Sequence, residues 1–182
     1  MRWFLFSTFL IVAFALVAFL YFATSTFPYQ KPPTPQVIKD LVSMQDPSGA
    51  VLQPAYIDYV LYELGAYQLH LSPGGKDLPR IAFIVGEKTF SAEVSEGKVH
   101  TQEGMIDKPD IRITTSREEI IQAIRSGLVK EYLKKSIADG KTHLEQVASY
   151  PVLFSKGYLN LYQELTGKSL TGNIIRIFSD GK

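Results

Sequence analysis

The alternation of hydrophobic and polar positions changes its period within one short stretch of the chain, Pro109–Gly127. In Asp110–Thr115 every second residue is apolar, as in a strand with one buried face. Ser116 and Glu119 then stand at the spacing of a capping box, and isoleucines follow at helical spacing until Gly127. The stretch therefore predicts a half-buried strand that leads directly into an amphipathic helix folding back over it.

Upstream of this stretch, a helical period gives way to an alternating one. Gln36–Asp46 and Ala55–Leu64 place their apolar residues on one helical stripe. Beyond them, apolar residues alternate in Tyr67–Leu71 and again around Phe83 and Phe90, with turn residues between the runs. Short strands joined by tight turns predict an antiparallel meander.

Downstream, the pattern predicts a helix over Val129–Ala138, a last strand within Lys141–Ser149 and a final helix over Tyr150–Leu165. The final helix has the clearest apolar stripe of the domain. A small apolar cluster, Ile174–Phe178, lies in the tail, where it could pack on the domain or bind a partner.

The N-terminal run Trp3–Ala23 carries no charge. As a helix it would span about 30 Å, the hydrocarbon thickness of a bilayer, and it predicts a single-pass membrane anchor. Arg2 precedes the run, so the positive-inside rule places the following domain on the extracytoplasmic side. The alternative is a signal peptide cleaved after the small residues around Ala23, with an unusually long apolar region. Pro28–Pro35 is expected to be an extended spacer.

The expected organisation has four parts: a transmembrane anchor in residues 1–26, a proline-rich linker with a short helix in 27–54, a folded domain in 55–167 and a tail in 168–182. The fold class is α+β. We expect an antiparallel sheet of five to six strands with helices covering one face around an apolar core or tunnel, preceded by one transmembrane helix.

The amino-acid composition argues against several classes of function. The chain has 182 residues, 46% of them hydrophobic, and a formal net charge of +1. Near-neutral charge argues against nucleic acid as a partner, because phosphate binding requires clustered Lys and Arg. Since the chain has no cysteine, disulfides, thiolate nucleophiles and cysteine-ligated zinc are excluded.

The sequence offers no catalytic or metal-binding constellation. His70, His100 and His143 are scattered, without the spacing of a metal site. No Gly-x-Ser-x-Gly motif occurs, and a helix cap fully explains the adjacent acids Glu118 and Glu119. We therefore expect neither an enzyme nor a bound metal or cofactor.

The order of these elements resembles one known family, the sterol carrier protein-2 (SCP2-type) lipid-binding domain. The resemblance extends over about Tyr67–Leu165. The matching pieces are Ile81–Phe83, Phe90–Val94, Glu96–Lys98, Asp110–Thr115, Glu118–Ile121 and Asp139–Lys141. The family implies an α+β fold in which helices cover one face of a five-stranded sheet around an apolar tunnel. Such tunnels accept sterols, fatty acids, acyl-CoA or phospholipids and carry no catalytic residues.

The resemblance implies a non-catalytic domain that binds a lipid or another apolar ligand, and the apolar run Trp3–Ala23 adds a membrane anchor that well-known members of the family lack. The alternative function is a structural or interaction subunit of a membrane protein complex, with a protein partner bound through the C-terminal tail. The residues expected to line a tunnel, or a closed core if no tunnel exists, are Phe83, Phe90, Ile111, Ile113, Ile120, Ile124, Phe154, Leu161 and Tyr162. The basic residues expected to contact an anionic headgroup, or to form a solvated helix surface, are Arg125, Lys130, Lys134 and Lys135.

Overall fold

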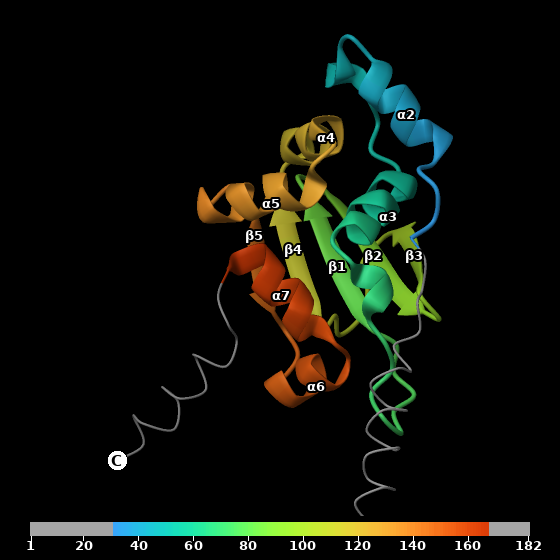
Figure 1. Ribbon diagram of the computed structural model, residues 1–182, viewed down its shortest axis with the longest axis vertical. Helices are drawn as coiled ribbons and strands as arrows, with labels where there is room; N and C mark the ends of the chain where they lie inside the picture. Colours follow the sequence, from blue (N-terminus) through green and yellow to red (C-terminus); the bar gives the residue numbers. More distant parts are fainter. Residues whose placement is uncertain (1–30, 168–182) are drawn as a thin grey trace, which may run out of the picture. The chain divides into compact units, whose positions relative to one another are not determined.

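The computed structural model describes residues 31–167, which form an α+β fold (Figure 1). Five strands make one sheet in the order β3-β2-β1-β4-β5. The strands are β1 (Arg80–Val85), β2 (Lys88–Ser95), β3 (Lys98–Glu103), β4 (Ile111–Thr115) and β5 (His143–Gln146).

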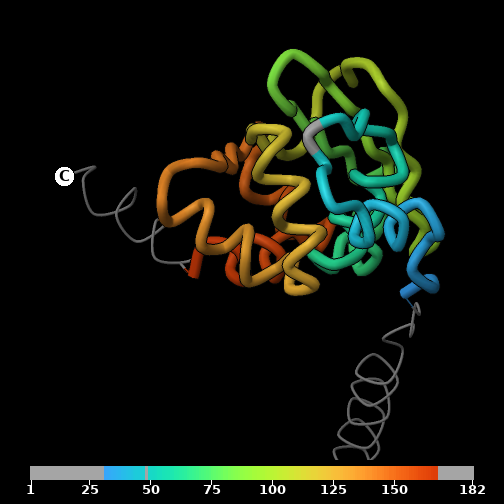
Figure 2. The backbone as a smooth tube through the Cα atoms, turned by 90° about the horizontal axis from the view of Figure 1, so that it is seen from above, coloured from blue at the N-terminus to red at the C-terminus, as the bar shows by residue number. Residues whose placement is uncertain are grey.

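Helices α3, α5 and α7 lie on one face of the sheet, as the two perpendicular views show (Figures 1 and 2). The α-helices are α2 (Gln36–Ser43), α3 (Pro54–Glu63), α4 (Arg117–Ser126), α5 (Val129–Ala138), α6 (Tyr150–Ser155) and α7 (Tyr158–Thr166). Two short 3₁₀ helices are η1 (Pro47–Gly49) and η2 (Ala66–Gln68). The hydrophobic core fills the space between the helices and this face of the sheet.

The opposite face of the sheet carries charged side chains in pairs across neighbouring strands. Arg80 on β1 contacts Glu93 on β2, with Nε and Oε1 3.1 Å apart. Arg112 on β4 forms an ion pair with Glu145 on β5. The sheet therefore has one apolar, covered face and one charged face.

The sheet is mixed, which corrects the predicted antiparallel arrangement. β1 and β4 are parallel, and their register pairs Ile81 with Ile111 and Phe83 with Ile113. The connection Gly104–Asp110 carries the chain from edge strand β3 past β2 and β1 to β4. At about 3.3 Å per residue it can cross three strand spacings of about 4.8 Å each. A period of two is the same for either strand direction, so alternation alone could not reveal this pairing.

The predicted strand and capped helix at Pro109–Gly127 are confirmed. The Ser116 hydroxyl accepts a hydrogen bond from Glu119 N–H at 3.2 Å, at the start of α4. Gly127 ends the helix in the left-handed conformation, at φ +68°. Helix α4 follows β4 with Ser116 alone between them, as the pattern indicated.

The predicted strand Tyr67–Leu71 is wrong. Gly65 turns the chain at φ +83° directly after α3, and the 3₁₀ helix η2 follows. Leu69 is buried, while His70 N–H donates to Lys156 C=O at 3.2 Å. Tyr67 and Gln68 thus belong to a 3₁₀ helix, and only the residues after it are extended, where they pack beside the α6–α7 junction and not in the sheet.

The predicted single helix Tyr150–Leu165 is also wrong, because it is divided into α6 and α7. Gly157 separates the two helices at φ +86°, a conformation that L side chains rarely adopt. A Cβ atom at this position would lie 2.9 Å from His70 Cε1. The break rotates the stripe of α6 relative to that of α7 and leaves Phe154 62% exposed.

Helix α2, which was expected in a linker, contributes to the core. Ile38 and Leu41 are 1% and 0% exposed. The following loop is held by Arg117, whose Nε donates to Ala50 C=O at 3.0 Å and whose Nη2 donates to Pro47 C=O at 3.2 Å. The segment before α3 is therefore part of the folded unit.

The predicted membrane localisation is wrong for the part of the chain that the structure describes. Between residues 31 and 167, no helix combines the length and the apolar character needed to cross a bilayer. The predicted anchor Trp3–Ala23 and the tail cluster Ile174–Phe178 lie outside the described residues.

Candidate functional site

A groove opens between α5, β5 and α7, which lie together at one end of the sheet (Figure 1). Its volume is about 510 Å³. The lining residues are Lys134, Ile137, Ala138, Thr142, His143, Leu144, Tyr162, Leu165 and Thr166. We call this hollow the β5 groove.

The walls of the β5 groove combine apolar and polar side chains. Ile137 comes from α5, Leu144 from β5, and Tyr162 and Leu165 from α7. The two helical walls are also joined by an ion pair between Lys130 on α5 and Glu164 on α7. A hollow bounded by three secondary-structure elements, with apolar walls and a few polar groups, is the kind of site in which proteins hold small ligands.

A chain of buried hydroxyl groups fixes the position of β5 relative to α5. Thr142 Oγ1 lies 2.7 Å from Ser136 Oγ and 2.8 Å from Thr115 Oγ1. All three residues are buried, and the Thr142 hydroxyl is engaged on both sides. These hydroxyls therefore satisfy one another and hold the floor of the β5 groove in place.

Lys134 supplies positive charge at the rim of the β5 groove, where its side chain is exposed. A Cβ atom on Gly167 would lie 3.8 Å from Lys134 Cε, so this side chain runs beside the C-terminal end of α7. The negative end of a helix dipole favours a cation there. The β5 groove thus combines apolar side chains, several polar side chains and the ammonium group of Lys134.

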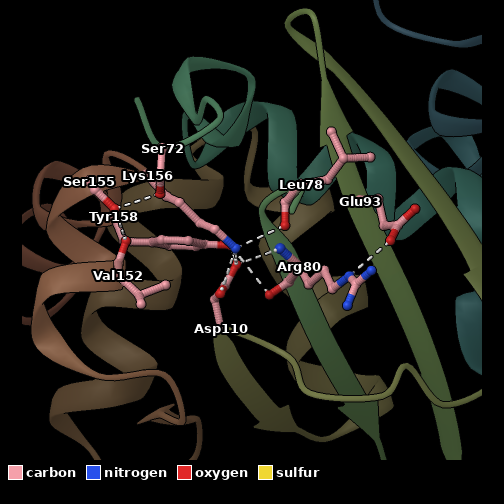
Figure 3. A network of polar contacts seen from close by, with 9 residues as sticks. All are labelled: Ser72, Leu78, Arg80, Glu93, Asp110, Val152, Ser155, Lys156 and Tyr158. Atoms are coloured by element: carbon pink, nitrogen blue, oxygen red, sulfur yellow. Dashed lines mark hydrogen bonds and ion pairs between the residues drawn. The ribbon is translucent and has the colours of Figure 1, made fainter. Parts of the chain in front are cut away.

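A second polar cluster lies inside the protein, at the junction of α6 and α7 with the sheet (Figure 3). Lys156 Nζ contacts both carboxylate oxygens of Asp110, at 2.9 and 3.0 Å, and donates to Leu78 C=O at 3.0 Å. The Tyr158 hydroxyl donates to Asp110 Oδ2 at 3.0 Å, and Arg80 N–H donates to the same oxygen at 2.8 Å. We call Asp110, Lys156 and Tyr158 the buried triad.

The buried triad has the chemistry of a structural cluster. Its three side chains are 4%, 5% and 1% exposed, and their polar groups are satisfied by one another and by backbone groups of the β1 region. Burial, reinforced by the charge of Asp110, raises the pKa of Tyr158 well above its ordinary value. The triad fixes α7, and with it one wall of the β5 groove, against the start of β1 and β4.

The structure places most of the residues predicted to line a tunnel or a closed core in one contiguous hydrophobic core. The residues that belong to this core are Phe83, Phe90, Ile111, Ile113, Ile120, Ile124 and Leu161. Tyr162 is half-buried and lines the β5 groove. Phe154 is the clear correction, since the break at Gly157 leaves its side chain at the surface.

The four predicted basic residues lie on α4 and α5 and have different surroundings. Lys134 alone lines the β5 groove, while Lys130 is paired with Glu164. Lys135 lines a separate polar hollow of about 100 Å³. Arg125 is half-buried at the end of α4. Of the predicted site residues, the structure therefore brings together Lys134 and Tyr162.

Sequence reasoning missed most of the groove lining. Ile137 and Leu165 were assigned to helical stripes and Leu144 to a strand, but no pattern showed that these elements meet. One signal was available for the buried triad: Lys156 interrupts an otherwise apolar helical stripe, directly before Gly157. Within residues 31–167, no three side chains of the metal-binding types lie close enough to hold a metal ion.

No family model matches this chain, and no curated protein matches it. Similar solved structures include SCP2-domain proteins. One is "UbiJ-SCP2 Ubiquinone synthesis protein", with a TM-score of 0.32 and 12% identity over 76% of this chain and 98% of that one. Another is palmitated SCP2L2 from Aedes aegypti, with a TM-score of 0.32 and 18% identity over 56% of this chain and 89% of that one.

The stereoselective inverting sec-alkylsulfatase Pisa1 from Pseudomonas sp. is also similar, with a TM-score of 0.38 and 11% identity over 58% of this chain. This chain spans 16% of that enzyme. At these TM-scores the likenesses carry no argument about what this chain binds or does.

Proposed function

We propose that this protein is a non-catalytic binder of an apolar ligand with an anionic end, such as a fatty acid, and that the β5 groove is its site. The observation that carries the proposal is a groove whose walls include Ile137, Leu144, Tyr162 and Leu165 and which has Lys134 at its rim. The sequence resemblance to SCP2-type domains supports the same class of ligand.

The dimensions and chemistry of the β5 groove suit such a ligand. A volume of about 510 Å³ lies within the range of roughly 300–1,000 Å³ found for small-molecule sites. Each methylene group buried there would contribute about 0.8 kcal/mol. A carboxylate at the rim would lie near the ammonium group of Lys134, an exposed pair that adds about 0.2–1 kcal/mol.

The test is a titration of the full-length chain with a fatty acid that carries an environment-sensitive fluorophore. Ala138 lines the groove but is exposed and lies outside the core, so Ala138→Trp fills the site without disturbing packing. We expect at least about a tenfold loss of affinity, equivalent to two lost methylene contacts. Gln122→Trp, at an exposed position of α4, is the matched control and should bind as the parent does.

The role of Lys134 is tested by the choice of ligand. Lys134→Gln should weaken binding of the fatty acid by about two- to fivefold and leave binding of the corresponding fatty alcohol unchanged. Lys135→Gln removes the neighbouring exposed cation, which lines a different hollow. It should change neither the affinity for the fatty acid nor that for the fatty alcohol. A parent chain that binds no fatty acid, or an Ala138→Trp variant that binds it equally well, would refute the proposal.

A further inference from the structure

β5 is an edge strand of the sheet, and among residues 31–167 no further strand pairs with its outer edge. The backbone pattern identifies the residues that face this edge. Val147 N–H donates to Asp110 C=O at 3.0 Å, just beyond the paired strands β4 and β5. Antiparallel strands alternate between hydrogen-bonded and non-hydrogen-bonded pairs. His143 and Glu145 therefore direct their backbone groups towards β4.

The other two residues of β5, Leu144 and Gln146, direct their N–H and C=O groups away from the sheet. Within residues 31–167 these groups have no backbone hydrogen-bond partner outside the strand pairing. The edge at β3 is different, because the Tyr62 hydroxyl accepts from Val99 N–H at 3.0 Å and α3 packs beside the strand. An uncovered edge next to an apolar groove is a template for one more strand.

The chain itself supplies a segment that fits this edge. Residues 168–182 follow α7, whose last residues, Leu165 and Thr166, line the β5 groove. In this tail, Ile174–Phe178 is rich in residues that favour strands and is bounded by Gly172-Asn173 and Asp180-Gly181. From Gly167 to Ile174 an extended chain spans about 23 Å, enough to return along β5.

Charge determines which side of this segment would face the β5 groove. Residues alternate between the two faces of a strand, so Ile175 and Ile177 share one face and Arg176 lies on the other. The charged face of the sheet carries Glu145 at its β5 end, with its side chain more than half exposed. Arg176 would lie beside Glu145, and the two isoleucines would then point into the groove.

We propose that Ile174–Phe178 pairs with the open edge of β5 as a sixth strand and that Ile175 and Ile177 fill the β5 groove. The tail then satisfies the backbone groups of Leu144 and Gln146 and covers the apolar walls. If the groove binds fatty acid, as proposed above, the ligand competes with the tail for the same space.

The docking is tested without any ligand, by amide hydrogen exchange of the full chain and of a variant that ends at Gly167. We expect Leu144 and Gln146 to exchange at least about tenfold more slowly in the full chain, because only there do their N–H groups have acceptors. His143 and Glu145 bond to β4 in both proteins and serve as internal controls that should not change.

Two double variants of the full chain test the facing of the strand. Ile175→Asp with Ile177→Asp should abolish the protection, since two carboxylates would lose their water against side chains such as Leu144 and Leu165. The double variant Ile174→Asp with Phe178→Asp changes the face of the strand that carries Arg176. It should retain the protection of the Leu144 and Gln146 amides. Equal protection in the full and shortened chains would overturn the proposal, as would equal effects of the two double variants.

If the protection depends on protein concentration, a second copy of the chain covers the edge instead of the chain's own tail. That result would also overturn the proposal. The shortened chain should also bind the fluorescent fatty acid about tenfold more tightly than the full chain. Unchanged fatty-acid affinity together with strong protection of Leu144 would overturn the competition but not the docking. Loss of fatty-acid binding in both chains would count against the proposed function alone.

Discussion

Asp110 is the residue on which three parts of the fold converge. Its carboxylate is buried and accepts hydrogen bonds from Lys156, Tyr158 and the backbone of Arg80. Its backbone C=O also accepts from Val147 N–H at 3.0 Å and from Ala148 N–H at 2.9 Å. A charge in this position is tolerated because its partners replace the water that it loses on folding.

Removal of Lys156 should therefore be severe. Lys156→Met retains much of the side-chain volume but leaves the Asp110 carboxylate buried without its counter-charge, at a cost of about 3–5 kcal/mol of unfolding free energy. Urea denaturation measures the loss. Replacement of both partners, Lys156→Met with Asp110→Leu, should destabilise less than the two single changes added together, and strict additivity would show that the pair is not coupled.

Tyr158 should give the stability of the protein an alkaline limit. Burial and the nearby Asp110 charge raise the pKa of Tyr158 above its ordinary value of 10.0, so above that pH the unfolded chain releases a proton that the folded protein retains. The unfolding free energy should fall as the pH rises beyond about 10, and Tyr158→Phe should reduce this slope. Some slope should persist, because burial and Glu63 also raise the pKa of Tyr59, to about 12.

The same substitution has a second effect at neutral pH. Tyr158→Phe removes a hydrogen bond to a charged acceptor and should cost about 1.5–3 kcal/mol. Denaturant curves recorded between pH 7 and 11 separate the two effects. A variant with the parent's slope above pH 10 would show that Tyr158 ionises equally in the folded and unfolded chain.

At the scale of elements, the break between α6 and α7 depends on one glycine. Gly157→Ala should cost about 1–2 kcal/mol for the left-handed backbone, plus the displacement of the His70 ring from a contact of 2.9 Å. Gly140→Ala is the matched control, because it has a similar φ of +72° and no atom within 4 Å of the added Cβ. Thermal melts of Gly157→Ala with and without His70→Ala should differ by the cost of that contact, and identical melts would exclude it.

A helix or strand could be predicted where a single capping residue or the spacing of its apolar residues determines it. Ser116 and Gly127 bound α4 through their own backbone chemistry, so the sequence was sufficient there. The prediction of a strand at Tyr67–Leu71 failed because alternation also occurs where a 3₁₀ helix leads into an extended segment outside the sheet. The division of Tyr150–Leu165 was missed because a glycine after Lys156 can lie within a helix or break it, and tertiary packing decides.

At the scale of the whole molecule, the sequence predicted an α+β fold. It predicted neither where the folded unit begins nor where the β5 groove lies. The β5 groove requires α5, β5 and α7 to meet, and no period in the sequence encodes that meeting. The parallel pairing of β1 with β4 depends on the path of Gly104–Asp110, which has no periodic signal. The assignment of α2 to a linker failed because a short amphipathic helix becomes stable only through its packing.

The inclusion of α2 in the folded unit can be measured. Leu41 is fully buried, and Leu41→Ala should destabilise the protein by about 2–5 kcal/mol if α2 unfolds together with the sheet. Val42→Ala changes the neighbouring residue, which is 46% exposed, and should cost less than about 0.5 kcal/mol. Equal and negligible effects in urea denaturation would place α2 outside the cooperative unit.

The parallel pair at the centre of the sheet also has a consequence for the order of folding. The meander of β1, β2 and β3 needs only short loops, whereas β4 joins β1 through contacts such as Arg80 with Asp110, 30 residues apart. Contacts between distant residues form more slowly because a longer loop must close first. The meander can therefore appear early as a three-stranded intermediate, with β1 as a temporary outer strand. Until β4 arrives, a newly synthesised chain would be most prone to aggregate along β1, in the middle of the finished sheet.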